Sequence, residues 1–191
     1  MRRTAIATAL ASTIVVAILI GACGSGSEKA STAPATTTTV DLKPPADLPG
    51  VQTFFNLTQN HVQGPVNYPQ TPPVGGDHAP VWQNCGFYSK PIVTEQGVHS
   101  MEHGAVWITY APDLPADQVA VLRNLAHSQT YVLVSPFPGL PSPVVTSAWG
   151  SQLKLPSVTD PELTRFVKYY RNGPQTKEPG ASCSGASGSP E

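Results

Sequence analysis

Two histidines stand four residues apart in the segment VHSMEHGAVWITY, residues 98–110. Residues with this spacing lie on the same side of a helix and on the same face of a strand, so His99 and His103 face the same way in either structure. Imidazoles so placed can share a metal ion. On a helix Glu102 would join them, which suits zinc or another borderline metal, whereas on a strand Met101 would lie between them, which favours copper.

A third ligand is available in GGDHAPVWQNCG, residues 75–86. The two glycines permit a tight turn that would present His78 from a loop. We therefore predict a site for copper or zinc, made by His78, His99, His103 and either Glu102 or Met101. The alternative is that these histidines are structural, and we expect that role for His61 and His127, as turn caps, partners of buried carbonyls or residues in water.

The five residues from His99 to His103 also fit H-x-x-E-H, which in zinc peptidases places two ligands and a general-base glutamate on one helix. That chemistry needs a helix for all three residues and a carboxylate ligand further along the chain. Gly104 and an expected strand follow at once and leave room for one turn. A metal-dependent hydrolase with Glu102 as base is therefore a weaker alternative, and we assign no catalytic residue.

An electron-transfer copper centre with Cys85, two histidines and Met101 is weaker still. The ligand types are suitable, but such centres usually take their cysteine, histidine and methionine from one late loop. Here Cys85 precedes His99 and Met101, and the expected strands are too few for a sandwich.

The amino terminus indicates export. Met1-Arg2-Arg3 precedes an almost wholly apolar stretch, as in a signal peptide over residues 1–22 or a transmembrane helix. Small residues then stand directly before Cys23, which resembles a bacterial lipobox and predicts cleavage before Cys23 and its lipidation. The alternative is a plain membrane anchor. Either interpretation places the body on the extracytoplasmic face of the cell membrane, with the lipid bilayer as a partner through Cys23; a protein partner is unknown.

Two cysteines then remain, Cys85 and Cys183. In an oxidising compartment an even pair predicts one disulfide. Residues 172–191 contain almost no large apolar side chain, so hydrophobic burial cannot hold this tail, yet it carries Cys183. A bridge over so long a loop would stabilise the fold by about 4–5 kcal/mol in the chain-entropy model. The competing interpretation makes Cys85 a metal thiolate.

Composition limits which partners the protein can attract and indicates how the chain divides into segments. Of the 191 residues only 12% are charged and the net charge is −1, so no attraction to nucleic acid is expected. Residues 23–49 are rich in Thr, Ala and Pro without periodicity, which predicts an extended tether. Residues 50–191 are predicted to form a single globular domain with an extended C-terminal tail.

The second half of this domain shows clear elements. We predict strands over residues 105–110, 131–135 and 143–148, and a helix from an Asp113 cap to His127. A second helix opens at Asp160 with a proline at its first position, carries one apolar stripe and can close at Gly173. The stripe consists of Leu163, Phe166, Val167 and Tyr170.

These elements predict an α+β fold, with a small mixed sheet of three to four strands and two helices. The half from Val51 to Val98 is rich in proline and glycine and should be mostly loop, with a short strand or helix near its start. VHSMEHG is expected to be a loop or single turn that ends at Gly104 and directs His99 and His103 into one pocket.

Several separated motifs carry a family resemblance. The chain contains, in this order, PPVGGDH, NCGFY, VHSMEHGAVWITY, SPVVTSAWG and EPGASC. Together they resemble the bacterial Domain of Unknown Function 3105 family, common in actinobacteria and often membrane-tethered, over about residues 64–183. The positions carried over are His78, Cys85, His99, Glu102, His103, Trp149 and Cys183. The family has no established activity, so the resemblance supports the domain boundaries and export and leaves the chemistry to the residues.

The sequence thus predicts an exported lipoprotein that handles a transition metal at the cell envelope. The alternative from another class is a non-catalytic envelope interaction module. In that case the histidines are structural, and Trp82, Trp107 and Trp149 serve packing or ligand contact.

Overall fold

The computed structural model describes residues 48–191. The predicted signal peptide, the lipidation site Cys23 and the tether up to residue 47 lie outside these residues. Among the helices of the described part, none combines the length and the apolar character that crossing a membrane requires.

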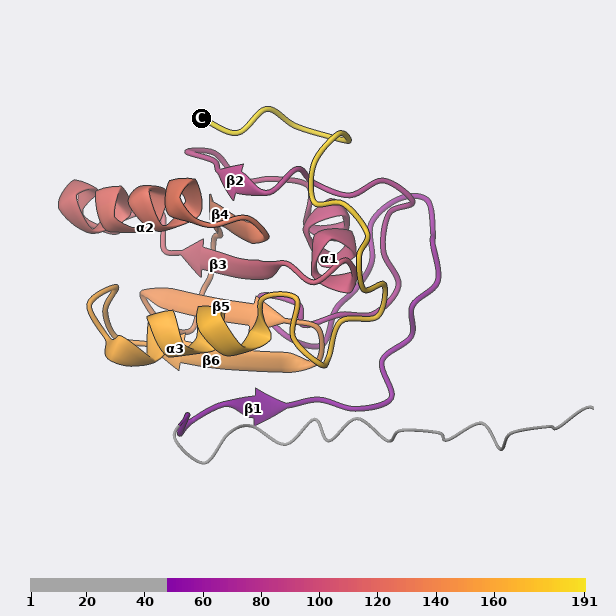
Figure 1. The fold of residues 1–191 in the computed structure, drawn as a ribbon, viewed down its shortest axis with the longest axis horizontal. Helices are drawn as coiled ribbons and strands as arrows, with labels where there is room; N and C mark the ends of the chain where they lie inside the picture. The colour runs from indigo at the N-terminus through magenta and orange to yellow at the C-terminus, as the bar shows by residue number, and fades with distance from the viewer. Residues whose placement is uncertain (1–47) are drawn as a thin grey trace, which may run out of the picture. The chain divides into compact units, whose positions relative to one another are not determined.

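A six-stranded mixed sheet forms the centre of the domain, in the order β1-β6-β5-β3-β4-β2 (Figure 1). β4 pairs in parallel with β3 and with β2, and the other neighbours are antiparallel. The strands are β1 Gln52–Thr53, β2 Gly86–Phe87, β3 Val106–Tyr110, β4 Val132–Pro136, β5 Val144–Ala148 and β6 Ser151–Leu155.

Three helices complete the fold: α1 Thr94–Glu102, α2 Ala116–Ser128 and α3 Pro161–Tyr170. α2 is the crossover that joins the parallel strands β3 and β4, which a tight hairpin cannot connect. It packs against β2 and β4, whereas α3 packs against β5 and β6 and α1 against β3 (Figure 1).

Alternation along β3 divides the core into two clusters. Val106, Ile108 and Tyr110 belong to a large cluster that also contains the apolar residues of α2 and α3. Trp107 belongs to a smaller cluster with Val98 and Met101 of α1, and with Tyr88, Leu133 and Trp149. The sheet is therefore covered by α2 and α3 on one face and by α1 with the N-terminal loops on the other.

α3 follows the sequence prediction closely. The Asp160 carboxylate accepts a hydrogen bond of 2.9 Å from the backbone N–H of Glu162, and Pro161 is the first helical residue. All four residues of the predicted apolar stripe are buried. The predicted closure at Gly173 is wrong, because the helix ends at Tyr170 and Asn172 takes the left-handed conformation with φ 49°.

The prediction that Asp113 caps α2 is also wrong. The helix begins at Ala116, and Pro115 occupies the cap position without a side-chain hydrogen bond. The backbone N–H of Leu114 bonds to the carbonyl of Ala111 at 2.9 Å, so residues 111–114 form a turn of their own before the helix.

The α+β class is confirmed, but the prediction undercounts its elements. β6 was missed because it contains polar residues that are buried, Ser151 and Gln152. The Gln152 amide donates to the carbonyl of Pro72 and to the Ser147 hydroxyl, which satisfies it inside the protein. β1 confirms the short element expected near residue 51, and β2 was not foreseen.

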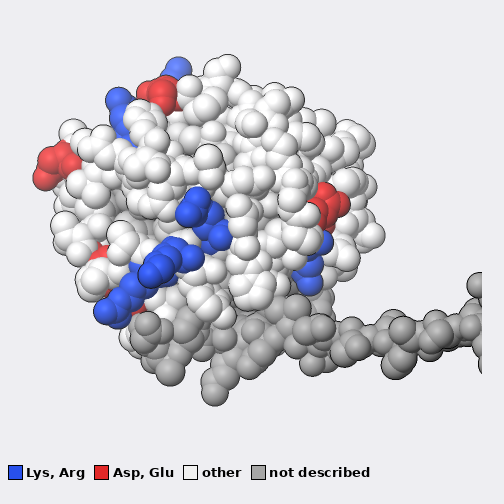
Figure 2. Space-filling view, in the orientation of Figure 1, with Lys and Arg blue, Asp and Glu red and all other residues white. Residues whose placement is uncertain are grey.

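The predicted disulfide is confirmed: Cys85 and Cys183 are bonded, with Cα atoms 5.4 Å apart. The bridge spans 98 positions and fixes the C-terminal segment, which passes beside α1 and continues toward β2 (Figure 1). On the face seen in Figure 2 most of the surface is uncharged, and basic and acidic residues form small groups.

Candidate metal centre

α1 replaces the loop or single turn that the sequence predicted for VHSMEHG. The helix is nine residues long, and Gly97 in its interior weakens the helical pattern. The reason for this glycine is tertiary, since a Cβ at position 97 would lie 2.9 Å from the Trp107 ring. The predicted end at Gly104 is confirmed: φ is 101°, and the N–H groups of Gly104 and Ala105 bond to the carbonyls of Met101 and Ser100, as in a Schellman motif.

The helix determines which neighbour joins the two histidines. His99 and Glu102 are three positions apart and His103 follows directly, so the three side chains share one side of α1 and its end. Met101 is fully buried in the smaller apolar cluster, against Trp107. The structure therefore brings Glu102 to the histidines and does not bring Met101.

Two loop segments bring further imidazoles to α1. His61 and His78 form a parallel bridge, in which Val62 N–H bonds to the His78 carbonyl at 2.8 Å and His78 N–H bonds to the Asn60 carbonyl at 3.0 Å. The Asp77 carboxylate accepts from the backbone and side chain of Asn60. These bonds fix the loop that presents His78.

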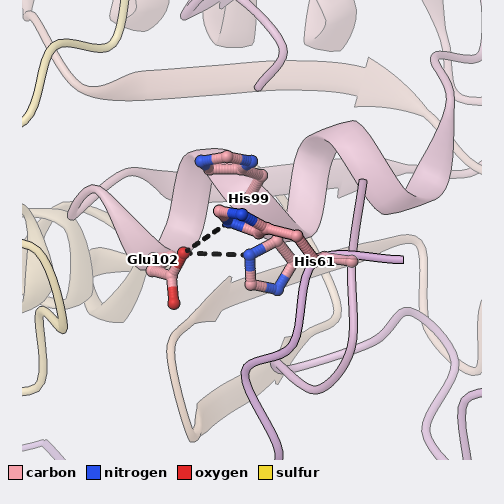
Figure 3. A group of neighbouring side chains, drawn as sticks. His61, His99 and Glu102 are labelled. Atoms are coloured by element: carbon pink, nitrogen blue, oxygen red, sulfur yellow. Dashed lines mark hydrogen bonds and ion pairs between the residues drawn. The ribbon is translucent and has the colours of Figure 1, made fainter. Parts of the chain in front are cut away.

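Glu102 lies at the centre of the first group of ligand atoms. Its Oε2 atom is 2.9 Å from Nε2 of His78 and 3.7 Å from Nε2 of His61. Figure 3 shows His61 and Glu102 directed toward one another, with His99 beside them. The His61 ring also stacks on the His99 ring, with centroids 4.8 Å apart.

A second group begins at the other side of His99. Its Nε2 atom is 2.9 Å from Nε2 of His103, which is 3.3 Å from Oε2 of Glu178. The Trp82 ring packs against His103 with a centroid distance of 4.8 Å. Glu178 belongs to the C-terminal segment and is half exposed, whereas His99 and His103 are buried.

Each of the three buried histidines directs Nδ1 at a backbone carbonyl. The distances are 2.8 Å from His78 to Gly76, 2.6 Å from His99 to Ala79 and 2.6 Å from His103 to Ser182. Such a bond places the proton on Nδ1 and leaves the lone pair on Nε2, which is how proteins orient imidazole ligands toward metals.

This orientation has a chemical consequence. Two neutral imidazoles that both donate from Nδ1 present lone pairs to each other across the 2.9 Å between Nε2 of His99 and Nε2 of His103. Lone pairs repel, so this approach requires a proton or a metal cation beside them. The same holds for Nε2 of His78 against the Glu102 carboxylate.

The charges of the buried groups differ. Burial lowers the pKa of His99 to about 4, opposed by its bond to Ala79 and reinforced by the neighbouring histidines, so this ring is neutral at neutral pH. Burial also acts to lower the pKa of His78, but hydrogen bonds to Glu102 and Gly76 outweigh it and raise that pKa. Burial acts to raise the pKa of Glu102, and the bond with His78 outweighs it, so this pKa is lowered. Without a metal the pair is held together by a proton.

The predicted ligands thus fall into two overlapping groups, each with ligand atoms within 4.8 Å of one another. The first, the inner group, contains His61, His78, His99 and Glu102; the second, the outer group, contains His99, His103 and Glu178. His78 and Glu102 belong to the inner group alone and His103 to the outer alone. Cys85 belongs to neither and is disulfide-bonded.

Sequence reasoning missed His61 and Glu178. His61 was expected to be structural, and no local pattern reveals a pairing with His78 across 17 positions. Glu178 lies in EPGASC, one of the segments that carry the family resemblance, and the nearby Cys183 was the available signal that this segment is held against the domain.

Imidazole nitrogens and a carboxylate oxygen form a ligand set that suits zinc and other borderline metals. Zinc bonds of 2.0–2.1 Å in a tetrahedron separate neighbouring ligand atoms by about 3.3 Å. Four pairs of ligand atoms in the two groups are 2.9–3.7 Å apart, close to that spacing, and all atoms of each group lie within 4.8 Å of one another. Small shifts of side chains would therefore accommodate an ion.

Fold and site define an α+β domain with a buried histidine–carboxylate cluster and a disulfide that holds its C-terminal segment. A family model described as "Protein of unknown function (DUF3105)" matches residues 61–185. The chain belongs to this family. No curated protein and no solved structure matches the chain.

Proposed function

We propose that this protein binds one divalent transition metal, zinc or copper(II), through the inner group, and that it handles this metal at the cell envelope. One observation carries the proposal: buried His78 and His99 have their Nδ1 atoms held by backbone carbonyls, so their Nε2 lone pairs are free for a ligand, and Nε2 of His78 lies 2.9 Å from the buried Glu102 carboxylate. A structural role for these histidines would be served equally well by rings that face apolar neighbours or water.

The energetics of burial favour a cation at the inner group. Burial of a carboxylate and several imidazoles is costly unless their charges and lone pairs are satisfied. His78 and Glu102 expose no more than 5% of their side chains, so water does little to satisfy them. A divalent cation would satisfy the lone pairs of His61, His78 and His99 and the negative charge of Glu102 together.

The ligand set favours zinc over copper(I), because the structure places Met101 in the apolar core instead of among the ligands. Copper(II) accepts imidazole and carboxylate as well, and it forms the more stable complexes of the two divalent ions. Both ions are therefore tested.

The cellular placement of this function is also a proposal. The sequence around Cys23 supports lipidation and an anchor in the cell membrane, and the disulfide agrees with an oxidising compartment outside the cytoplasm. Cys23→Ala is expected to abolish the lipid-dependent partition into detergent. Unchanged partition and mass would contradict the lipid anchor without touching the metal site.

The decisive test is equilibrium titration of the metal-free domain with Zn²⁺ and Cu²⁺, alongside elemental analysis. We expect one ion per chain in the wild type. His78→Ala should weaken binding by more than the 10–100-fold that loss of a supporting contact costs. The matched control is His127→Ala, which removes an imidazole outside both groups and should bind like the wild type. Equal affinity of the wild type and His78→Ala would make the non-catalytic interaction module the better interpretation.

A metal-dependent hydrolase is a second candidate, favoured by one specific finding. H-x-x-E-H lies on and at the end of a true helix, and Glu178 supplies the distant carboxylate that the motif requires beside His99 and His103. Against it, the Glu102 carboxylate is engaged by His78 at 2.9 Å. Turnover of peptide or ester substrates by the metal-loaded protein, lost in Glu102→Gln, would establish this candidate; equal rates in both would exclude it.

A further inference from the structure

His99 belongs to both groups of ligand atoms, and its chemistry limits how they can be used. Its Nδ1 atom donates to the Ala79 carbonyl at 2.6 Å, so only Nε2 can bind a metal. One lone pair binds one cation at a time. An ion held with His61, His78 and Glu102 therefore excludes a second ion that uses His99 with His103 and Glu178.

We propose that the two groups are successive positions for a single cation. The outer group, His99, His103 and Glu178, receives the ion at the surface, and the inner group, His61, His78, His99 and Glu102, retains it. His99 stays bound while the other ligands exchange around it. This inference rests on the proposed function and adds to it the route by which the metal enters and leaves.

The carboxylates of the two groups differ in burial, as entry and storage require. The Glu178 side chain is 50% exposed, whereas that of Glu102 is 5% exposed. An exposed carboxylate attracts cations from solution, and a buried one interacts with them more strongly because the surrounding dielectric is low. His61 also reaches the surface, but it carries no negative charge to attract an ion.

The C-terminal segment holds Glu178 in place against α1. The backbone N–H groups of Lys177 and Glu178 both bond to the Glu102 carbonyl, at 3.2 and 3.0 Å. Further along, the Ser182 carbonyl accepts from His103, and Cys183 is bonded to Cys85. Figure 1 shows this segment beside α1. The outer position is thus built by a segment that the fold fixes at three points.

The test is the rate of Zn²⁺ loading and release, measured by stopped flow with a chromophoric chelator, on the wild type, Glu178→Gln and a control. The control is Glu191→Gln, which removes another exposed carboxylate of the same segment, bound to Arg123 and Ser89 instead of to histidine. Glu178→Gln is expected to slow loading by about 10-fold, at the lower end of what electrostatic steering provides. Release should slow by the same factor, with a Kd within about threefold of the wild type, because a residue on the route affects both directions equally.

His103→Gln should also slow loading and release with a nearly unchanged Kd. Because this variant removes no negative charge, such a result would exclude the lost charge of Glu178 as the whole cause. Three results would overturn the proposal: two Zn²⁺ ions per chain, loading of Glu178→Gln as fast as the wild type, or weaker affinity with faster release, which would make Glu178 a ligand of the stored ion. Failure of the wild type to bind Zn²⁺ at all would instead overturn the proposed function itself.

Discussion

The two faces of the sheet are built by different means. The face under α2 and α3 is filled by aliphatic and aromatic side chains, such as Ile108, Leu163 and Phe166, that are fully buried or nearly so. The face under α1 carries a small apolar cluster around Trp107 and, beside it, buried histidines and a carboxylate. Apolar packing alone accounts for the structure of the face under α2 and α3. The face under α1 depends on backbone carbonyls that bind the histidines, on a disulfide and on one glycine, and no local sequence pattern predicts these features.

Stability and function are therefore distributed differently between the two faces. Substitutions on the α3 face should change the free energy of unfolding while leaving the ligand geometry intact. Substitutions on the α1 face should change both together, because the same contacts that hold the segments also orient the imidazoles.

Loss of the disulfide of the α1 face should destabilise the domain more than any other change considered below. Replacement of both Cys85 and Cys183 by serine should lower the free energy of unfolding by about 4–5 kcal/mol, since the bridge closes a loop over 98 positions. Urea unfolding of the metal-free domain measures it. A loss below about 1 kcal/mol would show that the hydrogen bonds to Glu102 and His103 hold the C-terminal segment unaided.

On the opposite face, Phe166→Ala should cost about 3–5 kcal/mol, because it opens a cavity at a fully buried ring that packs against Tyr170. Lys168→Ala, on the exposed side of the same helix, is the control and should stay within about 0.5 kcal/mol. Zn²⁺ affinity of the folded Phe166→Ala protein should equal that of the wild type. A weakened affinity would show that the two faces are coupled through the sheet.

The same contrast governs what could be predicted from sequence. The apolar stripe of α3, its Asp160 cap and the three central strands were predictable, since hydrophobic period and capping chemistry are local signals. β6 was hidden by its buried polar residues, and α1 by Gly97, whose function is to admit the Trp107 ring. Both exceptions depend on partners far away in the chain.

For the candidate site, residue types and spacing identified His78, His99, Glu102 and His103 as residues that lie close together, and the pairing of Cys85 with Cys183. They could not show that the set divides into two groups around His99. That division depends on His61 and Glu178, which reach the site through a loop bridge and a disulfide-held segment.

The free energy of unfolding should depend on pH through His99, which lies on the α1 face. In the unfolded chain His99 has a pKa near 6.5, and burial lowers it to about 4 in the folded protein. As pH falls, His99 takes up a proton in the unfolded state before it does so in the folded state. Its contribution to the free energy of unfolding is therefore fully present above pH 6.5 and declines between pH 6.5 and pH 4, with a loss of about 3 kcal/mol at pH 4.

The measurement compares urea unfolding of the metal-free wild type and His99→Gln between pH 7 and pH 4. The wild type should lose more stability than the variant. The groups that face His99 are His61, His78, His103 and Glu102, with Glu178 beyond His103. They are present in both proteins, including His78, whose raised pKa acts in the opposite direction. Parallel pH profiles would contradict a neutral, buried His99.

A milder change, Gly97→Ala, tests why the sequence pattern does not reveal α1. Gly97→Ala should destabilise the domain by about 1–2 kcal/mol. The new Cβ meets the Trp107 ring at 2.9 Å, and such overpacking costs about 1–3 kcal/mol. The better helix propensity of alanine returns up to about 1 kcal/mol. In a Trp107→Phe background the contact atoms of the larger ring are gone, so Gly97→Ala should become neutral or stabilising, and the double-mutant cycle isolates the coupling between the two residues. An unchanged cost in that background would locate the conflict in the helix itself, and Gly97 would then need another explanation than the close approach of the ring.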